Sequence, residues 1–209
     1  MTAHAGGAIP SSDRSRLRAE LRARRRALPL HERAIASRQF ARILQRSQQL
    51  RPGRRIAVYV AHDCEADPST IVHLARRNGC ELYLPAIADY RRRRMEFRRY
   101  SLDTRLRPNR YGIAEPERGT SPRIAVRRLD LVLVPLVAVD PRGTRMGTGA
   151  GFYDRCLQHL RAGRNWRRPK LIGLGYEFQR VAALAARTWD VPLDALLTEK
   201  GLYASKGSP

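Results

Sequence analysis

Lysine, cysteine and long apolar runs are all scarce in this chain, and each scarcity excludes a class of protein. The three cysteines, Cys64, Cys80 and Cys156, form neither a CxxC pair nor an even set, which argues against a zinc site or a disulfide framework. They predict free thiols in a reducing compartment. No run of about 18 apolar residues occurs, and the N-terminus lacks the apolar core of a signal peptide. We therefore expect a cytoplasmic protein that does not enter a membrane.

Basic residues are abundant despite the shortage of lysine. Arginine supplies nearly all of the 41 basic residues, against 19 acidic ones, and the formal net charge is +22. This field favours anionic partners, although a compositional arginine bias on solvated faces would also produce it. A nucleic-acid-binding protein is one alternative, motivated by runs at 22–26 and 91–94. It lacks aromatic interleaving, a zinc site and a helix-turn-helix pattern, so we expect no specific nucleic-acid partner.

The N-terminal third predicts a tail followed by helices. Small polar residues over 1–12 predict a flexible tail, and the length of 209 residues suits a single domain, which we place at 13–204. Apolar spacing predicts a basic helix over 13–28, with Ser12 or Asp13 as its cap, and a second helix over 30–46.

The remainder alternates between strand and helix patterns. Short apolar runs predict strands at 55–61, 81–87, 95–101, 129–140, 170–176 and 195–199. Asp67-Pro68 and Asn78-Gly79 predict the start and stop of a crossover helix. Further helices are expected at 151–161 and through Val181 and Leu184, and a hairpin tip or a loop at the arginines of 91–94. The alternation favours an α/β fold, a single-domain three-layer α/β/α sandwich with a largely parallel or mixed central sheet.

A glycine-rich loop is the most informative local feature. Residues 145–155 read RMGTGAGFYDR, with Gly147, Gly149 and Gly151 between a predicted strand and helix. Glycine permits left-handed backbone angles and lets successive N–H groups converge on a phosphate, and flanking Arg145 and Arg155 could add contacts. A tight connection without a ligand is the alternative. The spacing matches neither the dinucleotide fingerprint nor the P-loop.

The whole string resembles the nucleotide loop of the 5-formyltetrahydrofolate cyclo-ligase family, whose members typically read RLGxGxGYYD. Three further segments resemble family motifs in the same order: RSRLR at 14–18 is similar to the basic KxxLR element, YGIAEP at 111–116 to FGIPEP, and WDVPLD at 189–194 to HDVPLD. The likeness spans nearly all of 14–199. It implies ATP-dependent cyclisation of 5-formyltetrahydrofolate to 5,10-methenyltetrahydrofolate, with release of ADP and phosphate. A nucleotide-dependent enzyme of similar fold with another formyl or carboxylate substrate is the alternative.

The resemblance also implies roles for individual residues. Arg145 is the expected catalytic residue. The expected ATP-binding residues are Arg14, Arg18, Arg145, Gly147, Thr148, Gly149, Ala150, Gly151, Phe152 and Tyr153. Val60, Glu65 and Tyr111 are expected to contact the folate, and Tyr111 to stack on its pterin. Asp154 and Asp190 are the expected contacts of Mg²⁺, the implied cofactor.

Departures from the family pattern affect the charge at the site. Arg14 replaces the usual lysine and keeps its charge, whereas Thr148 and Ala150 supply no cation, so charge assistance falls to Arg14, Arg18 and Arg145. A strand-end guanidinium is not expected in a core. Replacement of Arg145 by alanine is therefore expected to lower activity and leave the fold intact. The positive field would suit a polyglutamylated folate.

A role outside ligand binding stays open for four of these residues. Asp154 could be a charge in the first turn of a helix, and Asp190 a turn residue. Glu65 could be a solvated loop acid, and Tyr111 a core aromatic.

Overall fold

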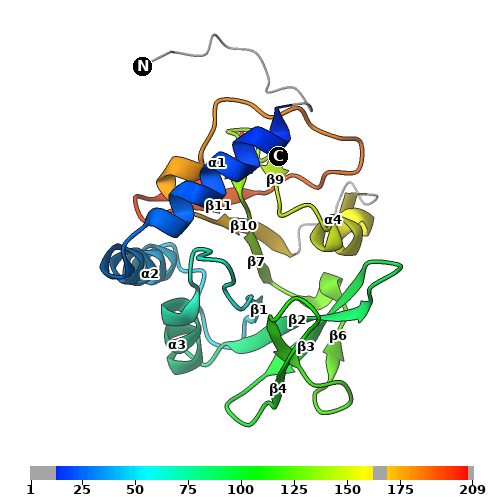
Figure 1. Ribbon diagram of the computed structural model, residues 1–209. Helices are drawn as coiled ribbons and strands as arrows, with labels where there is room; N and C mark the ends of the chain where they lie inside the picture. The colour runs from blue at the N-terminus through cyan, green and yellow to red at the C-terminus, as the bar shows by residue number, and fades with distance from the viewer. Residues whose placement is uncertain (1–12, 162–168, 207–209) are drawn as a thin grey trace.

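The computed structural model describes residues 13–161 and 169–206 (Figure 1). Its α-helices are α1 (Arg14–Ala27), α2 (Leu30–Arg46), α3 (Ser69–Arg77) and α4 (Phe152–Leu157), with 3₁₀ turns at Val126–Arg128, Gln158–Arg161 and Glu177–Gln179. Its strands are β1 (Arg55–Ala57), β2 (Glu81–Asp89), β3 (Arg94–Tyr100), β4 (Leu106–Pro108), β5 (Ala114–Pro116), β6 (Arg123–Ile124), β7 (Leu131–Pro135), β8 (Ala138–Val139), β9 (Arg145–Met146), β10 (Lys170–Leu174), β11 (Ala195–Leu197) and β12 (Leu202–Ala204).

An eight-stranded sheet forms the centre of the molecule, in the order β12-β11-β10-β7-β1-β2-β3-β6. The five strands from β11 to β2 are parallel, and β12, β3 and β6 join as antiparallel edges. From β1 the chain crosses to β2 on one side and later returns through β7 on the other. Ligands in such sheets bind beyond the carboxyl ends of the strands, where the order reverses.

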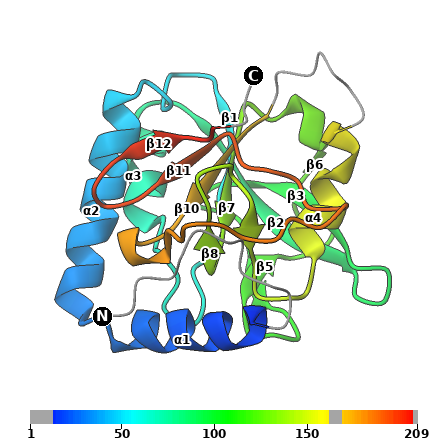
Figure 2. The ribbon, with the colours of Figure 1, turned by 90° about the horizontal axis from the view of Figure 1, so that it is seen from above.

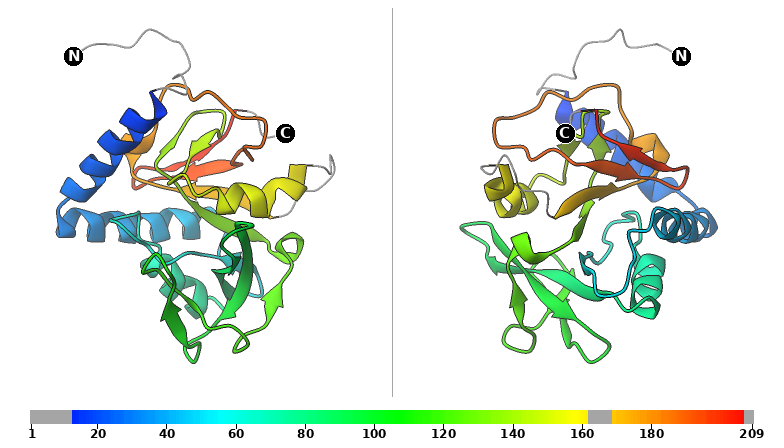
Figure 3. Two further views of the ribbon diagram at one scale, coloured as in Figure 1. Left: turned by 45° about the vertical axis from the view of Figure 1, so that its right-hand side comes forward. Right: turned by 180° about the vertical axis from the view of Figure 1, so that it is seen from behind.

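Helices cover both faces of this sheet, as the α/β/α prediction required (Figures 1 and 3). On one face, Phe40 and Leu44 of α2 and Ile71 of α3 pack against the sheet in a buried apolar cluster. On the other face, Leu157 of α4 packs against Val132 and its neighbours. Seen from above, α1 runs alongside the two-stranded β8–β9 ribbon, onto which it packs through Leu21 (Figure 2).

Several element predictions are confirmed. The second helix spans 30–46, and the arginine cluster forms the tip of the β2–β3 hairpin, with a left-handed Arg93. The crossover helix ends at Asn78-Gly79 as expected, but it begins at Ser69, one residue later than predicted, with the Asp67 carboxylate accepting from the Ser69 N–H at 2.9 Å. The cysteines are free.

Other element predictions are wrong. The apolar run 129–140 is not one strand: β7 ends at Pro135, and the chain turns into the separate β8–β9 ribbon. The first strand stops at Ala57, and no helix passes through Val181 and Leu184. Asp13 stands at the N-cap of α1 but makes no side-chain cap, and the alternative, Ser12, lies outside the described residues.

The predicted tail 1–12 also lies outside those residues. Within 13–161 and 169–206, no helix combines the length and the apolar character that crossing a bilayer requires.

Candidate active site

The glycine loop is open and unusually folded. It joins β9 to α4, so it follows a two-stranded ribbon and not the long strand that the sequence predicted. Gly149 has a φ of +110° and Gly151 a φ of +71°, angles at which a side chain would strain the backbone. A Cβ on Gly147 or Gly149 would meet no atom within 4 Å. The loop therefore leaves space along its backbone for a ligand.

Arg145 differs from its prediction, because it is a core residue. Its side chain is 3% exposed, and its guanidinium donates to the Asp154 carboxylate and to the Val191 carbonyl oxygen. Burial lowers the pKa of Arg145, and the charges of Asp154 and Asp190 oppose that shift. The residue thus ties β9 to α4 and to the 181–194 segment. The expectation that this strand-end guanidinium lies outside the core is wrong. The ground for expecting its replacement to spare the fold is thereby removed.

Two arginines of α1 contact the segments that line the cavity, Arg18 the glycine loop and Arg14 the 181–194 segment. Arg18 donates through Nε to the Gly147 carbonyl oxygen at 3.1 Å, and the buried Arg14 donates to the Ala185 carbonyl oxygen at 2.7 Å. Burial lowers the pKa of Arg18, and the positive charges of Arg14 and Arg187 lower it further. These guanidinium groups lie close together, and within 13–161 and 169–206 no carboxylate forms an ion pair with Arg18, which favours an anionic ligand.

The two carboxylates predicted to hold a metal interact with each other. Burial raises the pKa of Asp154, Arg145 opposes the shift, and the charge of Asp190 adds to it. Asp190 accepts from the Arg187 N–H at 2.9 Å. Within 13–161 and 169–206, no three His, Cys, Asp or Glu side chains gather into a metal site. A metal here would need oxygens from a ligand.

Glu65 is a partly buried acid that lines the cavity, and not a fully solvated one. It accepts from the His62 N–H at 3.2 Å, and burial raises its pKa while the charge of Arg25 opposes that shift. Val60, at the end of the same strand connection, packs on the apolar cluster beneath.

The loop that carries Glu65 is fastened to α1 by Asp63. The Asp63 carboxylate accepts from Arg22 at 2.7 Å, Arg25 at 3.2 Å and Arg26 at 2.6 Å. The bonds from Arg26 and Arg22 hold the pKa of Asp63 far below its usual range. Asp63 and Cys64 both have positive φ angles, of 50° and 59°. Non-glycine residues adopt such angles only where surrounding contacts hold them, and the three arginines supply those contacts.

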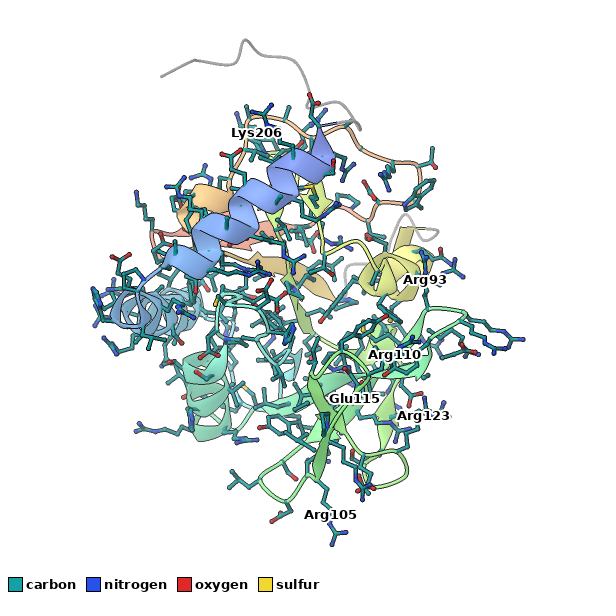
Figure 4. The ribbon with its side chains drawn as sticks, in the orientation of Figure 1. Arg93, Arg105, Arg110, Glu115, Arg123 and Lys206 are labelled. Carbon is teal, nitrogen blue, oxygen red and sulfur yellow. The ribbon has the colours of Figure 1, made fainter. Side chains whose placement is uncertain are left out.

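Tyr111 belongs to an aromatic group at the cavity edge. It is 47% exposed, which rules out the core alternative, and its ring lies 5.9 Å from that of Tyr90 and 6.3 Å from that of Phe152. Glu115 lies on the neighbouring strand β5 and accepts from Asn109 and from the Ile87 N–H. Figure 4 places Arg93 beside α4 and Glu115 farther down the same side of the molecule.

All of the predicted site residues line one cavity of about 850 Å³. The structure brings them together from α1, the segment after β1, the β4–β5 hairpin, the glycine loop and the 181–194 segment. Their individual roles stay predictions. Sequence reasoning missed several residues that also line this cavity: Arg22, Arg25, Tyr59, Asp63, Arg93, Asn109, Glu115, Arg187 and Trp189. The unusual Arg-rich first helix was the signal that could have indicated Arg22 and Arg25.

Comparison with known proteins gives one consistent family. A model described as the 5-formyltetrahydrofolate cyclo-ligase family matches residues 10–199. A relative named 5-formyltetrahydrofolate cyclo-ligase from Haemophilus influenzae is 33% identical over 180 residues, covering 85% of this chain and 91% of the relative. One of the same name from Escherichia coli K12 is 32% identical over 185 residues, covering 88% and 98%.

Solved structures agree with this. The chain resembles the NMR structure of Aquifex aeolicus 5,10-methenyltetrahydrofolate synthetase with a TM-score of 0.76 at 28% identity, over 93% of each chain. It resembles the Mycoplasma pneumoniae 5,10-methenyltetrahydrofolate synthetase structure with a TM-score of 0.69 at 22% identity, over 90% of this chain and 99% of that one, a likeness that supports the fold alone.

Proposed function

The chain belongs to the 5-formyltetrahydrofolate cyclo-ligase family, and on that premise we propose that its cavity binds ATP beside 5-formyltetrahydrofolate and closes the folate to 5,10-methenyltetrahydrofolate. One observation carries the proposal. The glycine loop and its arginines line the same cavity as Glu65 and Tyr111, so two substrates can meet there. ADP and phosphate are the other products.

The chemistry requires activation of a poor leaving group. The formyl oxygen attacks the γ-phosphorus of ATP, the bond to ADP breaks, and an iminium phosphate forms. N10 then attacks the formyl carbon and loses its proton, and phosphate leaves with the former formyl oxygen. The atoms balance as ADP, phosphate and the methenyl cation.

The residues of the chain supply position and charge for these steps. Phosphoryl transfer depends mainly on alignment and on neutralisation of the phosphate oxygens. Arg18 and Arg14 provide positive charge beside the open backbone of the glycine loop. Arg145, just before the loop, holds it in place by its bond to Asp154, just after the loop. Glu65, held by its loop, is placed to accept a hydrogen bond from the pterin. Tyr111 offers an exposed ring on which the pterin can stack.

The acidic pair fits Mg²⁺ that is bound mainly by phosphates. Mg²⁺ usually takes one or two carboxylates together with substrate phosphates and water. Asp154 and Asp190 both line the cavity and their charges interact, and each carboxylate keeps acceptor capacity beyond its present hydrogen bonds. Bound there, the ion would neutralise charge on the phosphate oxygens.

A polyglutamate tail on the folate is the finer proposal. Its carboxylates would meet the arginine excess of the surface, which raises the local concentration of polyanions. Polyglutamylated 5-formyltetrahydrofolate should then have the lower KM. Equal turnover of mono- and polyglutamate substrates at low and at high salt would contradict this proposal.

An absorbance assay tests the proposed reaction. Methenyl product should accumulate from 5-formyltetrahydrofolate only with ATP and Mg²⁺, and chelation of the metal should stop it. Glu65→Gln should raise the KM for folate more than that for ATP. Glu117→Gln is the matched control, because Glu117 pairs with Arg107 outside the cavity. Failure of the wild-type protein to form methenyl product in the complete mixture would refute the function.

A further inference from the structure

Trp189 is an exposed aromatic side chain at the cavity. It is 56% exposed, and it lines the cavity together with its neighbours Arg187 and Asp190. Few large apolar side chains are as exposed among the described residues. Among those, Tyr111 and Trp189 line the cavity, and they lie in different parts of its wall. Because removing apolar surface from water is favourable, a ligand that covers this exposed indole would gain binding free energy.

The contacts of Trp189 place it at the glycine-loop end. The Arg187 guanidinium carbon lies 5.6 Å from the centre of the indole ring. The charge of Arg187 acts on Arg18, which bonds the Gly147 carbonyl oxygen. Asp190, next in the chain, acts on Arg145 and Asp154 beneath the loop. Tyr111 lies in a different segment, between β4 and β5, and its ring neighbours those of Tyr90 and of Phe152, the first residue of α4.

We propose that Trp189 is the stacking surface for the nucleobase of ATP. A triphosphate held along the glycine loop needs a flat apolar partner for its base near the same end of the cavity, and the half-exposed indole provides one. Aromatic stacking on a base is sequence-tolerant and substantial, and an adjacent guanidinium adds to it. Trp189 is thus a nucleotide-affinity residue, whereas Tyr111 serves the pterin. The inference rests on the proposed function, since it presupposes that ATP binds here.

Tryptophan fluorescence isolates the residue, because the chain has only two tryptophans, Trp166 and Trp189. In Trp166→Phe, the emission reports Trp189 alone. ATP without folate should change this emission, and inorganic tripolyphosphate, which carries no base, should bind with little change. Trp189→Ala should weaken ATP binding about tenfold, from the usual size of one base–aromatic stack. The same variant should bind tripolyphosphate as tightly as the wild-type protein, and Trp189→Phe should recover most of the ATP affinity.

A second aromatic–arginine pair gives the matched control. The Arg180 guanidinium carbon lies 3.9 Å from the centre of the Tyr203 ring, and neither residue lines the cavity. Tyr203→Ala should leave the ATP affinity unchanged.

The outcomes separate the inference from the function on which it rests. If wild-type protein neither binds ATP nor forms methenyl product, the proposed function fails. If wild-type protein does both, the inference is overturned by equal ATP affinity in Trp189→Ala, by an equal loss of tripolyphosphate affinity, or by a rise in the KM for folate alone. The last result would assign Trp189 to the pterin.

Discussion

Replacement of Arg145 by alanine should destabilise the whole protein as well as impair catalysis. The guanidinium is 3% exposed and joins two segments, through Asp154 in α4 and the Val191 carbonyl oxygen. Its loss leaves the Asp154 carboxylate without its cation and the carbonyl oxygen without its donor. Val191 is buried, so its carbonyl oxygen does not recover a full hydrogen bond, and the partly exposed Asp154 carboxylate is only partly compensated by water.

The expected loss of stability follows from the burial of the Arg145–Asp154 ion pair. Removal of one partner of a buried ion pair costs about 3–5 kcal/mol. The Asp154 side chain is 27% exposed, so solvent compensates part of its charge and the lower end applies, about 3 kcal/mol. For a chain of this size each kcal/mol lowers Tm by about 2–4 °C, which predicts a fall of about 6–12 °C.

Thermal unfolding of a double-mutant cycle measures the effect. In Arg145→Ala/Asp154→Asn the unpaired charge is gone, so this variant should be more stable than Arg145→Ala alone. The two single changes should be non-additive by about 1 kcal/mol or more. An unchanged Tm for Arg145→Ala, with full loss of activity, would refute the structural role and restore the view of Arg145 as a free catalytic arginine.

Three further changes test other parts of the site. Asp63→Asn keeps a residue that tolerates positive φ but removes the charge, so we expect the free energy of unfolding to fall by about 2 kcal/mol and the KM for folate to rise. Unfolding curves and steady-state kinetics measure the two effects. If neither value changes, the three arginines do not hold this loop through Asp63. Burial raises the pKa of Glu65, so ionisation of this carboxyl lowers the free energy of unfolding of the protein as pH rises above the pKa of the unfolded chain. The Tm of Glu65→Gln should therefore rise relative to that of the wild type between pH 4 and pH 7. A difference in Tm that does not change with pH would contradict this prediction. Gly149→Ala should cost about 1–3 kcal/mol through its φ of +110°, and Gly147→Ala, which adds the same methyl group without a positive φ, should cost less; equal losses would argue against strain.

Local patterns in the sequence predicted those parts of the fold that local chemistry decides. The helix over 30–46 and the stop at Asn78-Gly79 were predicted correctly, because spacing and turn residues act within a few positions. The run 129–140 was misread as one strand, since every residue from Leu136 to Asp140 is buried although the main-sheet strand has already ended at Pro135. Val137 and Ala138 pack with Leu21 of α1, whereas Leu136 and Val139 join the cluster on the α4 face of the sheet. Apolar composition indicates burial and cannot say against which partner a segment packs.

In the site, too, local motifs were predicted from the sequence and long-range contacts were not. The family motifs predicted a set of residues from five segments of the chain, and these line one cavity. The burial of Arg145 was not predictable, because it depends on Asp154 and Val191, contacts that only the folded arrangement of α4 and the 181–194 segment creates. Asp63 could likewise be given no role from the sequence, since its contacts come from three arginines about forty residues away.

The transfer of the formyl oxygen to phosphate is the central claim, and an isotope label follows it directly. Single-turnover reaction of this protein with 5-formyltetrahydrofolate labelled with ¹⁸O in its formyl group should place one ¹⁸O atom in each inorganic phosphate released. Phosphate without the label, with ¹⁸O recovered in water, would contradict phosphorylation of the formyl oxygen in this cavity.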